Sequence, residues 1–173
     1  MKVYDGSQTE DTQDVDPERI KVGIAEYEVT ADGAELTTSG LGSCVGVALY
    51  DKTSAVAGLI HVMLPEAEDM DGEKPAKFAD AGTELLIEEM EDLGAQPRQM
   101  QAKIAGGSDM LDFSEGGAGI GDRNVEEVRE TLSEYGIPIV GEDVGGDHGR
   151  SLRLEARNGD LVVKSANQEN QRL

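Results

Sequence analysis

The chain has 173 residues, one cysteine and no tryptophan, and its 36 Asp and Glu against 15 Lys and Arg give a formal net charge of -21. A surface this negative repels phosphate backbones and anionic lipid headgroups, which excludes nucleic acid and membrane surfaces as partners. The charge is typical of a solvated halophilic surface, because concentrated salt screens the self-repulsion. An acidic patch for one partner is the alternative interpretation.

The length suits a single domain, which we expect over residues 18–165. Residues 1–17 form an acidic leader and residues 166–173 a polar tail, and both have too few apolar side chains to offset the entropy of ordering. We therefore expect both ends to be disordered. No apolar run of about 18 residues and no signal peptide is visible, so we expect a cytoplasmic protein without direct membrane insertion.

Hydrophobic periodicity predicts more strands than helices. The expected strands, in chain order, are 20–29, 35–38, 44–50, 55–63, 100–105 and 137–142, followed by a hairpin over 152–163. One helix is expected over 75–93, beginning at a proline and ending before Gly94, and a second carries apolar residues from Val125 to Tyr135.

Two of these strands are apolar on both faces and are joined by the polar turn 51–54. If this turn is symmetric, Tyr50 faces Ala55 and Cys44 lies directly opposite His61. Opposed residues of an antiparallel pair have Cβ atoms about 4.5 to 5.5 Å apart, so the thiol and the imidazole would meet. Small residues line the same face, and they leave room either for a substrate side chain or for a closely packed helix.

A cysteine paired with a histidine is a candidate nucleophile for amide hydrolysis. Cys44 is the sole cysteine, which excludes an intramolecular disulfide and a cysteine-rich zinc site. A paired imidazolium lowers the thiol pKa, the thiolate attacks the amide carbonyl, and the histidine protonates the leaving ammonia before water hydrolyses the thioester. The backbone N–H groups of Gly42, Ser43 and Cys44 are candidate oxyanion donors. A small core cysteine is the alternative interpretation.

Other polar residues extend this candidate site. Thr37, Thr38 or Ser39 would orient the imidazole, and the spacing does not choose among them. In the loop 145–149, His148 is a second candidate base, and Gly145 and Gly146 are candidate pocket residues at which the backbone can approach a substrate. No cofactor and no metal site are expected, because the histidines and carboxylates lack ligand spacing.

Several segments resemble the chemoreceptor glutamine deamidase family, CheD. They are 41–51 (LGSCVGVALYD), 58–65 (GLIHVMLP), 75–80 (PAKFAD), 103–108 (KIAGGS), 120–124 (IGDRN) and 142–150 (EDVGGDHGR). The resemblance extends over residues of about 20 to 165 and implies a Cys-His-Thr triad made of Cys44, His61 and Thr38. It also implies an α+β fold, a three-layer β/β/α sandwich with mixed sheets like that of the cytotoxic necrotizing factor catalytic domain.

The same resemblance implies a substrate and a partner. The substrate would be selected glutamines of methyl-accepting chemotaxis receptors, in cytoplasmic receptor arrays, and the partner a CheC-type phosphatase. A non-catalytic adaptor that binds the phosphatase or the receptors is the main alternative. A papain-like protease or a receptor methylesterase is the enzymatic alternative, because the same thiol attacks esters and peptides.

Overall fold

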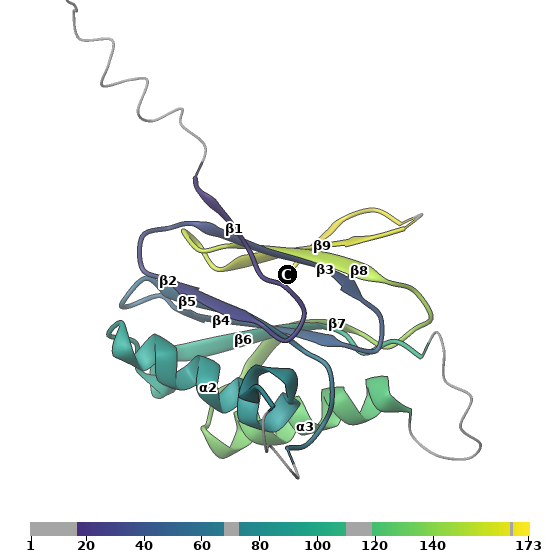
Figure 1. Cartoon of the computed structure of the whole chain (residues 1–173). Helices are drawn as coiled ribbons and strands as arrows, with labels where there is room; N and C mark the ends of the chain where they lie inside the picture. Colours follow the sequence, from purple (N-terminus) through teal and green to yellow (C-terminus); the bar gives the residue numbers. More distant parts are fainter. Residues whose placement is uncertain (1–16, 68–72, 110–118, 167) are drawn as a thin grey trace, which may run out of the picture.

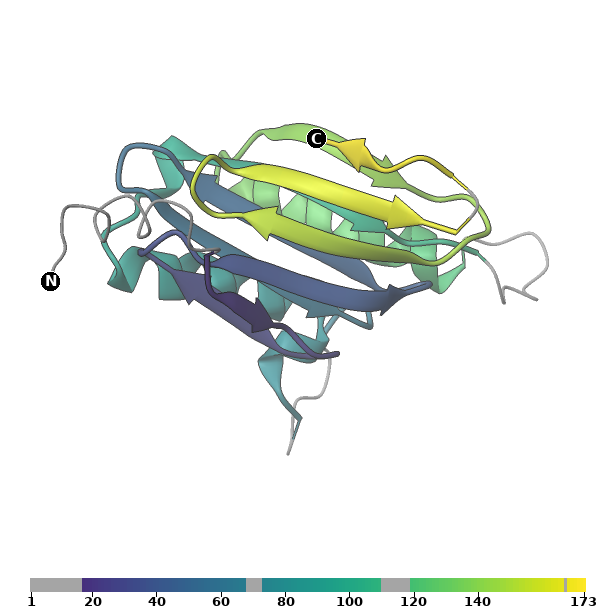
Figure 2. The same cartoon turned by 90° about the horizontal axis from the view of Figure 1, so that it is seen from above.

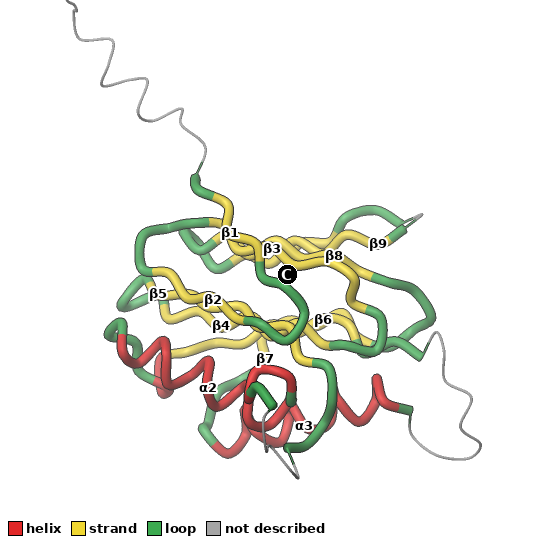
Figure 3. Tube along the Cα trace, viewed as in Figure 1, coloured by secondary structure: helices red, strands yellow, loops and turns green. Residues whose placement is uncertain are grey.

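A computed structural model describes residues 17–67, 73–109, 119–166 and 168–173. Two sheets stack face to face, and a layer of helices covers one of them, as the cartoon and the Cα tube show from the same side (Figures 1 and 3). The expected three-layer β/β/α sandwich with mixed sheets is therefore confirmed. The expected leader lies almost wholly outside the described residues.

The outer sheet has the strand order β1-β3-β8-β9-β10. Its strands are β1 (Arg19–Lys21), β3 (Glu35–Leu41), β8 (Arg150–Glu155), β9 (Asp160–Ser165) and β10 (Gln171–Arg172). β1 runs parallel to β3, and the other neighbours are antiparallel. Seen from above, this sheet faces the viewer and the helices lie behind it (Figure 2). Among the described residues, its outward face carries no helix.

The middle sheet has the order β2-β5-β4-β6-β7. It consists of β2 (Tyr27–Thr30), β5 (Val56–Val62), β4 (Val45–Asp51), β6 (Met100–Gly106) and β7 (Ile139–Val144). Only β6 and β7 run parallel. Every residue of β5 is buried because this sheet is covered on both faces, which explains the continuous apolar run in the sequence.

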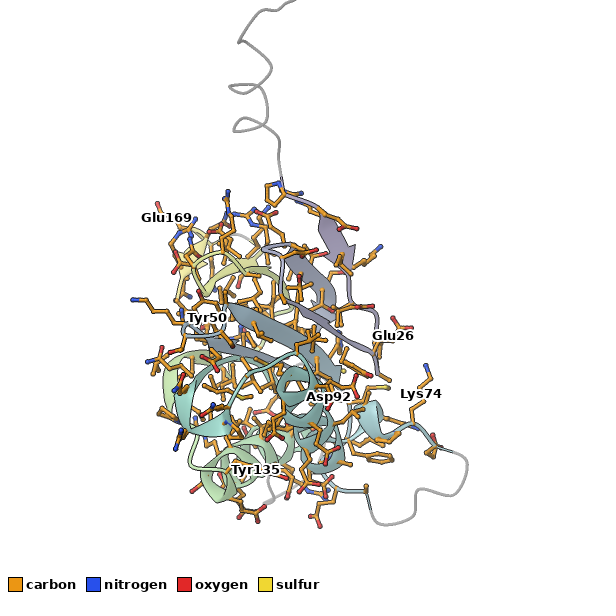
Figure 4. The ribbon with its side chains drawn as sticks, turned by 90° about the vertical axis from the view of Figure 1, so that its left-hand side faces the viewer. Glu26, Tyr50, Lys74, Asp92, Tyr135 and Glu169 are labelled. Carbon is orange, nitrogen blue, oxygen red and sulfur yellow. The ribbon has the colours of Figure 1, made fainter. Side chains whose placement is uncertain are left out.

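The helical layer consists of α2 (Ala79–Asp92) and α3 (Ile120–Glu134), with the short 3₁₀ helices η1 (Pro75–Lys77) and η2 (Pro97–Gln99). The expected helix over 75–93 is interrupted at Phe78, whose backbone is extended and separates η1 from α2. The apolar sides of both helices pack on the middle sheet, while Figure 4 shows Asp92 and Tyr135 on the helical side of the molecule.

Two hydrophobic cores result from this layering. One lies between the helices and the middle sheet and includes Val47, Ile60 and Leu86. The other lies between the two sheets and includes Leu59 and Leu152. Because side chains alternate along a strand, each residue of β5 belongs to one core or the other according to its parity. His61 has the parity of Leu59 and therefore faces the outer sheet.

The expected disorder of the tail is wrong. β10 pairs with β9, and Leu173 exchanges backbone hydrogen bonds with Leu161. Arg172 forms salt bridges with Glu155 and Asp160, and Nζ of Lys103 donates to the Leu173 carbonyl at 2.8 Å. Charged side chains thus fix a segment whose own apolar content is too small to do so.

Candidate active site

The hairpin of β4 and β5 has a different register from the predicted one. Gly46, not Cys44, is the partner of His61, and the pairing continues to Asp51 with Val56. The prediction that Cys44 lies directly opposite His61 is therefore wrong by two residues. A shift of two residues preserves the face, so Cys44, which directly precedes β4, takes the register position diagonal to His61 on the side that faces the outer sheet. Within a regular ladder, diagonal neighbours have Cα atoms about 7 to 8 Å apart, within reach of an imidazole.

The turn chemistry of Asp51 explains this shift. Its buried carboxylate accepts hydrogen bonds from the backbone N–H groups of Thr53 and Ser54 and from that of Gln96. Asp51 therefore remains in β4, the loop begins one residue later than predicted, and Ala55 closes it with a left-handed backbone, φ 59°. A short carboxylate that accepts from the next residues is typical of turns of this kind.

Thr38 of the outer sheet reaches across the interface between the sheets to His61. Its hydroxyl donates to the Val22 carbonyl, with Oγ1 2.7 Å from the oxygen, and Oγ1 lies 2.8 Å from Nδ1 of His61. Because the single hydroxyl proton is used on Val22, Nδ1 must carry the proton that it donates to Oγ1. The structure thus selects Thr38 from the three hydroxyl residues as the contact of His61.

This hydrogen bond leaves Nε2 of His61 unprotonated. Nε2 is buried and has no hydrogen-bond partner among the described residues. Burial lowers the pKa of His61 from 6.5 to about 4. Burial also raises the pKa of the Cys44 thiol, an effect partly offset by a hydrogen bond from its own backbone N–H. Both shifts favour a neutral thiol and a neutral imidazole in the free protein, whereas the sequence predicts a thiolate and an imidazolium.

The small residues on this face do not leave an open space at Gly46. A Cβ atom there would collide with Cδ1 of Leu152 from the outer sheet. Neither interpretation of the small face holds at Gly46, because the closely packed neighbour there is the outer sheet rather than a helix or a substrate side chain.

Cys44 lies in the short turn 42–44 between β3 and β4, in which all three carbonyl groups are held. The Gly42 oxygen accepts from the Ser108 N–H at 2.9 Å, and the Cys44 oxygen accepts from the Gly107 N–H at 2.8 Å. The Ser43 oxygen accepts from Nδ2 of Asn124 at 2.9 Å. The turn is thereby fixed from the side of β6 and α3, and the half-buried thiol packs against the core between the sheets.

The N–H groups of this turn differ in their availability. The Gly42 N–H donates to the Gly40 carbonyl at 3.1 Å, which removes it from the candidate oxyanion donors. The Ser43 and Cys44 N–H groups have no backbone acceptor within the described ranges of the chain, and that of Cys44 donates to its own sulfur. These two N–H groups therefore stay candidate oxyanion donors.

The loop 145–149 lies next to this turn. Gly145 donates to the Gly106 carbonyl at 3.0 Å, and the Gly146 carbonyl accepts from the Asp109 N–H at 3.0 Å. Gly106 directly precedes the residue that holds the Cys44 carbonyl, so the two candidate pocket glycines border the turn 42–44. His148 lies beside Gly146, and its Nε2 is buried and lacks a partner among the described residues.

Three residues at this site have no role assigned by the sequence patterns. They are Val22, Asn124 and Arg150. The guanidinium of Arg150 is buried, binds Asp143 at 3.0 Å and donates to the Gly145 carbonyl at 2.9 Å, which holds the loop. A signal was present for Asn124, because it is a polar residue one position before the apolar stripe of α3. Val22 acts through its backbone, which carries no side-chain signal.

No group of three or more potential metal ligands occurs among the described residues, and no helix of that part of the chain is long and apolar enough to cross a membrane. A free thiol diagonal to an oriented, neutral imidazole, inside an α+β sandwich, defines a candidate thiol-dependent hydrolase site.

Comparison with known proteins identifies the family. The sequence profile described as CheD chemotactic sensory transduction matches residues 63–165. A Haloarcula marismortui protein named "Probable chemoreceptor glutamine deamidase CheD" is 66% identical over 96% of both chains. Another with that name, from Natronomonas pharaonis, is 46% identical over 88% of this chain and 91% of its own. The chain therefore belongs to the CheD family.

A solved structure supports the fold assignment. Neisseria meningitidis protein NMB0706 matches with a TM-score of 0.51 at 13% identity, over 80% of this chain and 67% of its own. At this identity the match shows a shared fold.

Proposed function

We propose that this protein hydrolyses the side-chain amides of selected glutamines on methyl-accepting chemotaxis receptors, with Cys44 as nucleophile, His61 as general base and Thr38 as the residue that orients His61. The names of the family relatives support the reaction and the substrate. The observation that carries the residue roles is the hydrogen bond from Nδ1 of His61 to Thr38, because it leaves a buried, unpaired Nε2 as the base.

The reaction begins from the neutral pair. Nε2 of His61 removes the Sγ proton as sulfur attacks the glutamine carbonyl carbon, and the resulting oxyanion accepts from the N–H groups of Ser43 and Cys44. The imidazolium then gives its proton to the amide nitrogen, ammonia leaves, and a thioester remains. Water, deprotonated by the same imidazole, attacks the thioester carbonyl, and the thiolate leaves and regains a proton.

Starting from a neutral pair, the hydrogen bond between His61 and Thr38 gains strength during the reaction. The attack creates an imidazolium in a buried environment, and the Nδ1–H bond to Thr38 strengthens when the ring becomes charged. The hydrogen bond is therefore worth more in the transition state than in the resting protein, which is the requirement for catalysis.

The test uses a purified receptor cytoplasmic fragment incubated with wild-type protein, Cys44→Ala and His61→Ala. Peptide mass spectrometry and ammonia release report the conversion of glutamine to glutamate. Wild-type conversion that both substitutions abolish, while circular dichroism shows a folded protein, supports the proposal. Retained activity in His61→Ala would transfer the base role elsewhere, with His148 the next residue to substitute.

The alternatives give different products. Cleaved peptides would indicate a protease, and methanol release from methylated receptor would indicate a methylesterase. Binding of receptor or of a CheC-type phosphatase without any conversion would indicate the non-catalytic adaptor. The CheC-type partner and an association with cytoplasmic receptor arrays remain predictions of the family resemblance, to be tested by co-sedimentation.

A further inference from the structure

Asn124 is a fully buried amide in α3, at the point where the helical layer meets the turn 42–44. Its Nδ2 donates to the Ser43 carbonyl and to the Met63 carbonyl, both at 2.9 Å. Both acceptors are carbonyl oxygens, which fixes the orientation of the amide with nitrogen toward them. One nitrogen therefore joins the segment next to Cys44 to the segment that follows His61.

The two carbonyls are held close by this shared donor. Because each oxygen lies 2.9 Å from the same nitrogen, they can be no farther apart than twice that distance. Ser43 directly precedes Cys44, and Met63 follows His61 by two residues, just after the end of β5. The side chain of Asn124 thus limits the distance between the turn 42–44 and the end of β5.

The register of the hairpin shows why such a link is needed. Val45 pairs with Val62, so the next rung would join Cys44 and Met63, but the chain leaves the ladder at Cys44. The Met63 N–H instead donates to the Lys77 carbonyl. Asn124 replaces the missing rung, which lets Cys44 turn out of the strand while it stays near His61.

The approach of α3 depends on a glycine in its first turn. A Cβ atom on Gly121 would lie 2.6 Å from the carbonyl carbon of Gly107 and would also strike the Ser108 carbonyl oxygen. Gly107 and Ser108 are the residues whose N–H groups hold the other two carbonyls of the turn. The helix therefore supports all three carbonyls, directly through Asn124 and indirectly through this contact.

Stability alone does not explain a buried amide here. Oδ1 of Asn124 is buried and has no hydrogen-bond partner among the described residues, an arrangement that costs free energy. We propose that Asn124 is a positioning residue, which holds the Cys44 turn at the distance from His61 that proton transfer requires. This inference rests on the deamidase function proposed above, because it assigns Asn124 to the same Cys44–His61 pair.

The experiment is a double-mutant cycle in which the measured quantity is the alkylation rate of Cys44, the sole cysteine. Alkylation of Cys44 by iodoacetamide is measured from pH 5 to 10 in wild type, His61→Ala, Asn124→Ala and the double variant. In wild type, loss of His61 should change the alkylation rate near neutral pH by at least about fivefold, within the range of coupling between neighbouring residues. In the Asn124→Ala background the same loss should change it by less than about twofold.

Two controls separate positioning from folding. Thr83→Val removes another fully buried polar group, from α2, and should leave the coupling intact. Asn124→Asp keeps the shape of the side chain and serves if Asn124→Ala does not fold. In both Asn124 variants, kcat for the receptor fragment should fall about a hundredfold, with KM within about twofold.

Each outcome decides the inference. Coupling that persists without Asn124, or that is absent from wild type, overturns the positioning role. A kcat that falls only in proportion to the unfolded fraction also overturns it. If coupling is present and lost with Asn124 while wild type deamidates nothing, the positioning role stands and the proposed reaction is wrong.

Discussion

Replacing Thr38 by valine removes one hydroxyl and almost no volume, so it isolates the hydrogen bonds of the His61 contact. In the folded protein the substitution leaves the Val22 carbonyl and the Nδ1–H of His61 buried without their partner. Each unpaired buried group costs about 1 to 3 kcal/mol, so we expect about 2 to 4 kcal/mol of lost stability for the two together after partial relaxation.

The effect on activity should be separate from the effect on stability. Without the acceptor at Oγ1, the imidazole is free to place its proton on Nε2, and that tautomer cannot accept the thiol proton. General base catalysis contributes about 10² to 10⁴ in rate, so we expect kcat to fall by about a hundredfold, measured as ammonia release at saturating receptor fragment.

Two matched variants separate the loss of the Thr38 hydroxyl from a general effect on β3. Thr38→Ser keeps the hydroxyl and should retain activity within a few-fold, whereas Thr37→Val removes a half-buried hydroxyl from the adjacent residue and should change nothing. Urea unfolding gives the stability of each variant. A Thr38→Val protein with wild-type kcat would refute the orienting role, and equal losses in Thr37→Val would show a general effect on β3.

Three further predictions concern the burial of His61, the close approach of Gly121 and the contact between Arg172 and Glu155. Burial lowers the pKa of His61 from 6.5 to about 4, so the unfolded protein binds a proton at this residue before the folded protein does as the pH falls. The free energy of unfolding should therefore decrease between pH 6.5 and 4, by at most about 3 kcal/mol. Urea unfolding of wild type and of His61→Gln, which lacks this titration, measures the difference. Gly121→Ala should destabilise the protein by about 1 to 3 kcal/mol and slow Cys44 alkylation, because the new Cβ meets backbone rather than a flexible side chain. Hydrogen bonding to Arg172 lowers the pKa of Glu155 to about 2, so deleting residues 171–173 should raise that pKa. NMR titration of the carboxyl group measures the change, and an unchanged titration would contradict this role for the tail.

The strands and helices could largely be predicted because their periodicities are strong, whereas the three-layer arrangement was implied by the family resemblance. β5 is buried at every position, and its uninterrupted apolar run predicted a strand between two layers. The predicted single strand over 20–29 failed because β1 and β2 belong to different sheets, and Ala25 takes a left-handed backbone with φ 62° between them. An alanine carries no sequence signal for that conformation.

The candidate site was predicted in part for a related reason. Parity along a strand survives a shift of two residues, so Cys44 and His61 were correctly assigned to one face although their direct opposition was wrong. The exact register depended on the hydrogen bonds of the Asp51 side chain, which a four-residue turn pattern does not predict. Contacts between sheets, such as that of Thr38 with His61, depend on packing that no local pattern encodes.

The position of this pair between the sheets separates its chemistry from the surface charge. α2 carries six acidic residues and α3 five, and a surrounding field this negative favours protonation of a histidine. The pKa of His61 is nevertheless low, because the cost of burying the charged ring exceeds the attraction of acids on the far side of the middle sheet. We therefore expect salt that screens the acidic helices to act on folding rather than on this pair. In the proposed mechanism, the proton transfer between Cys44 and His61 depends instead on the local geometry set by Thr38 and Asn124.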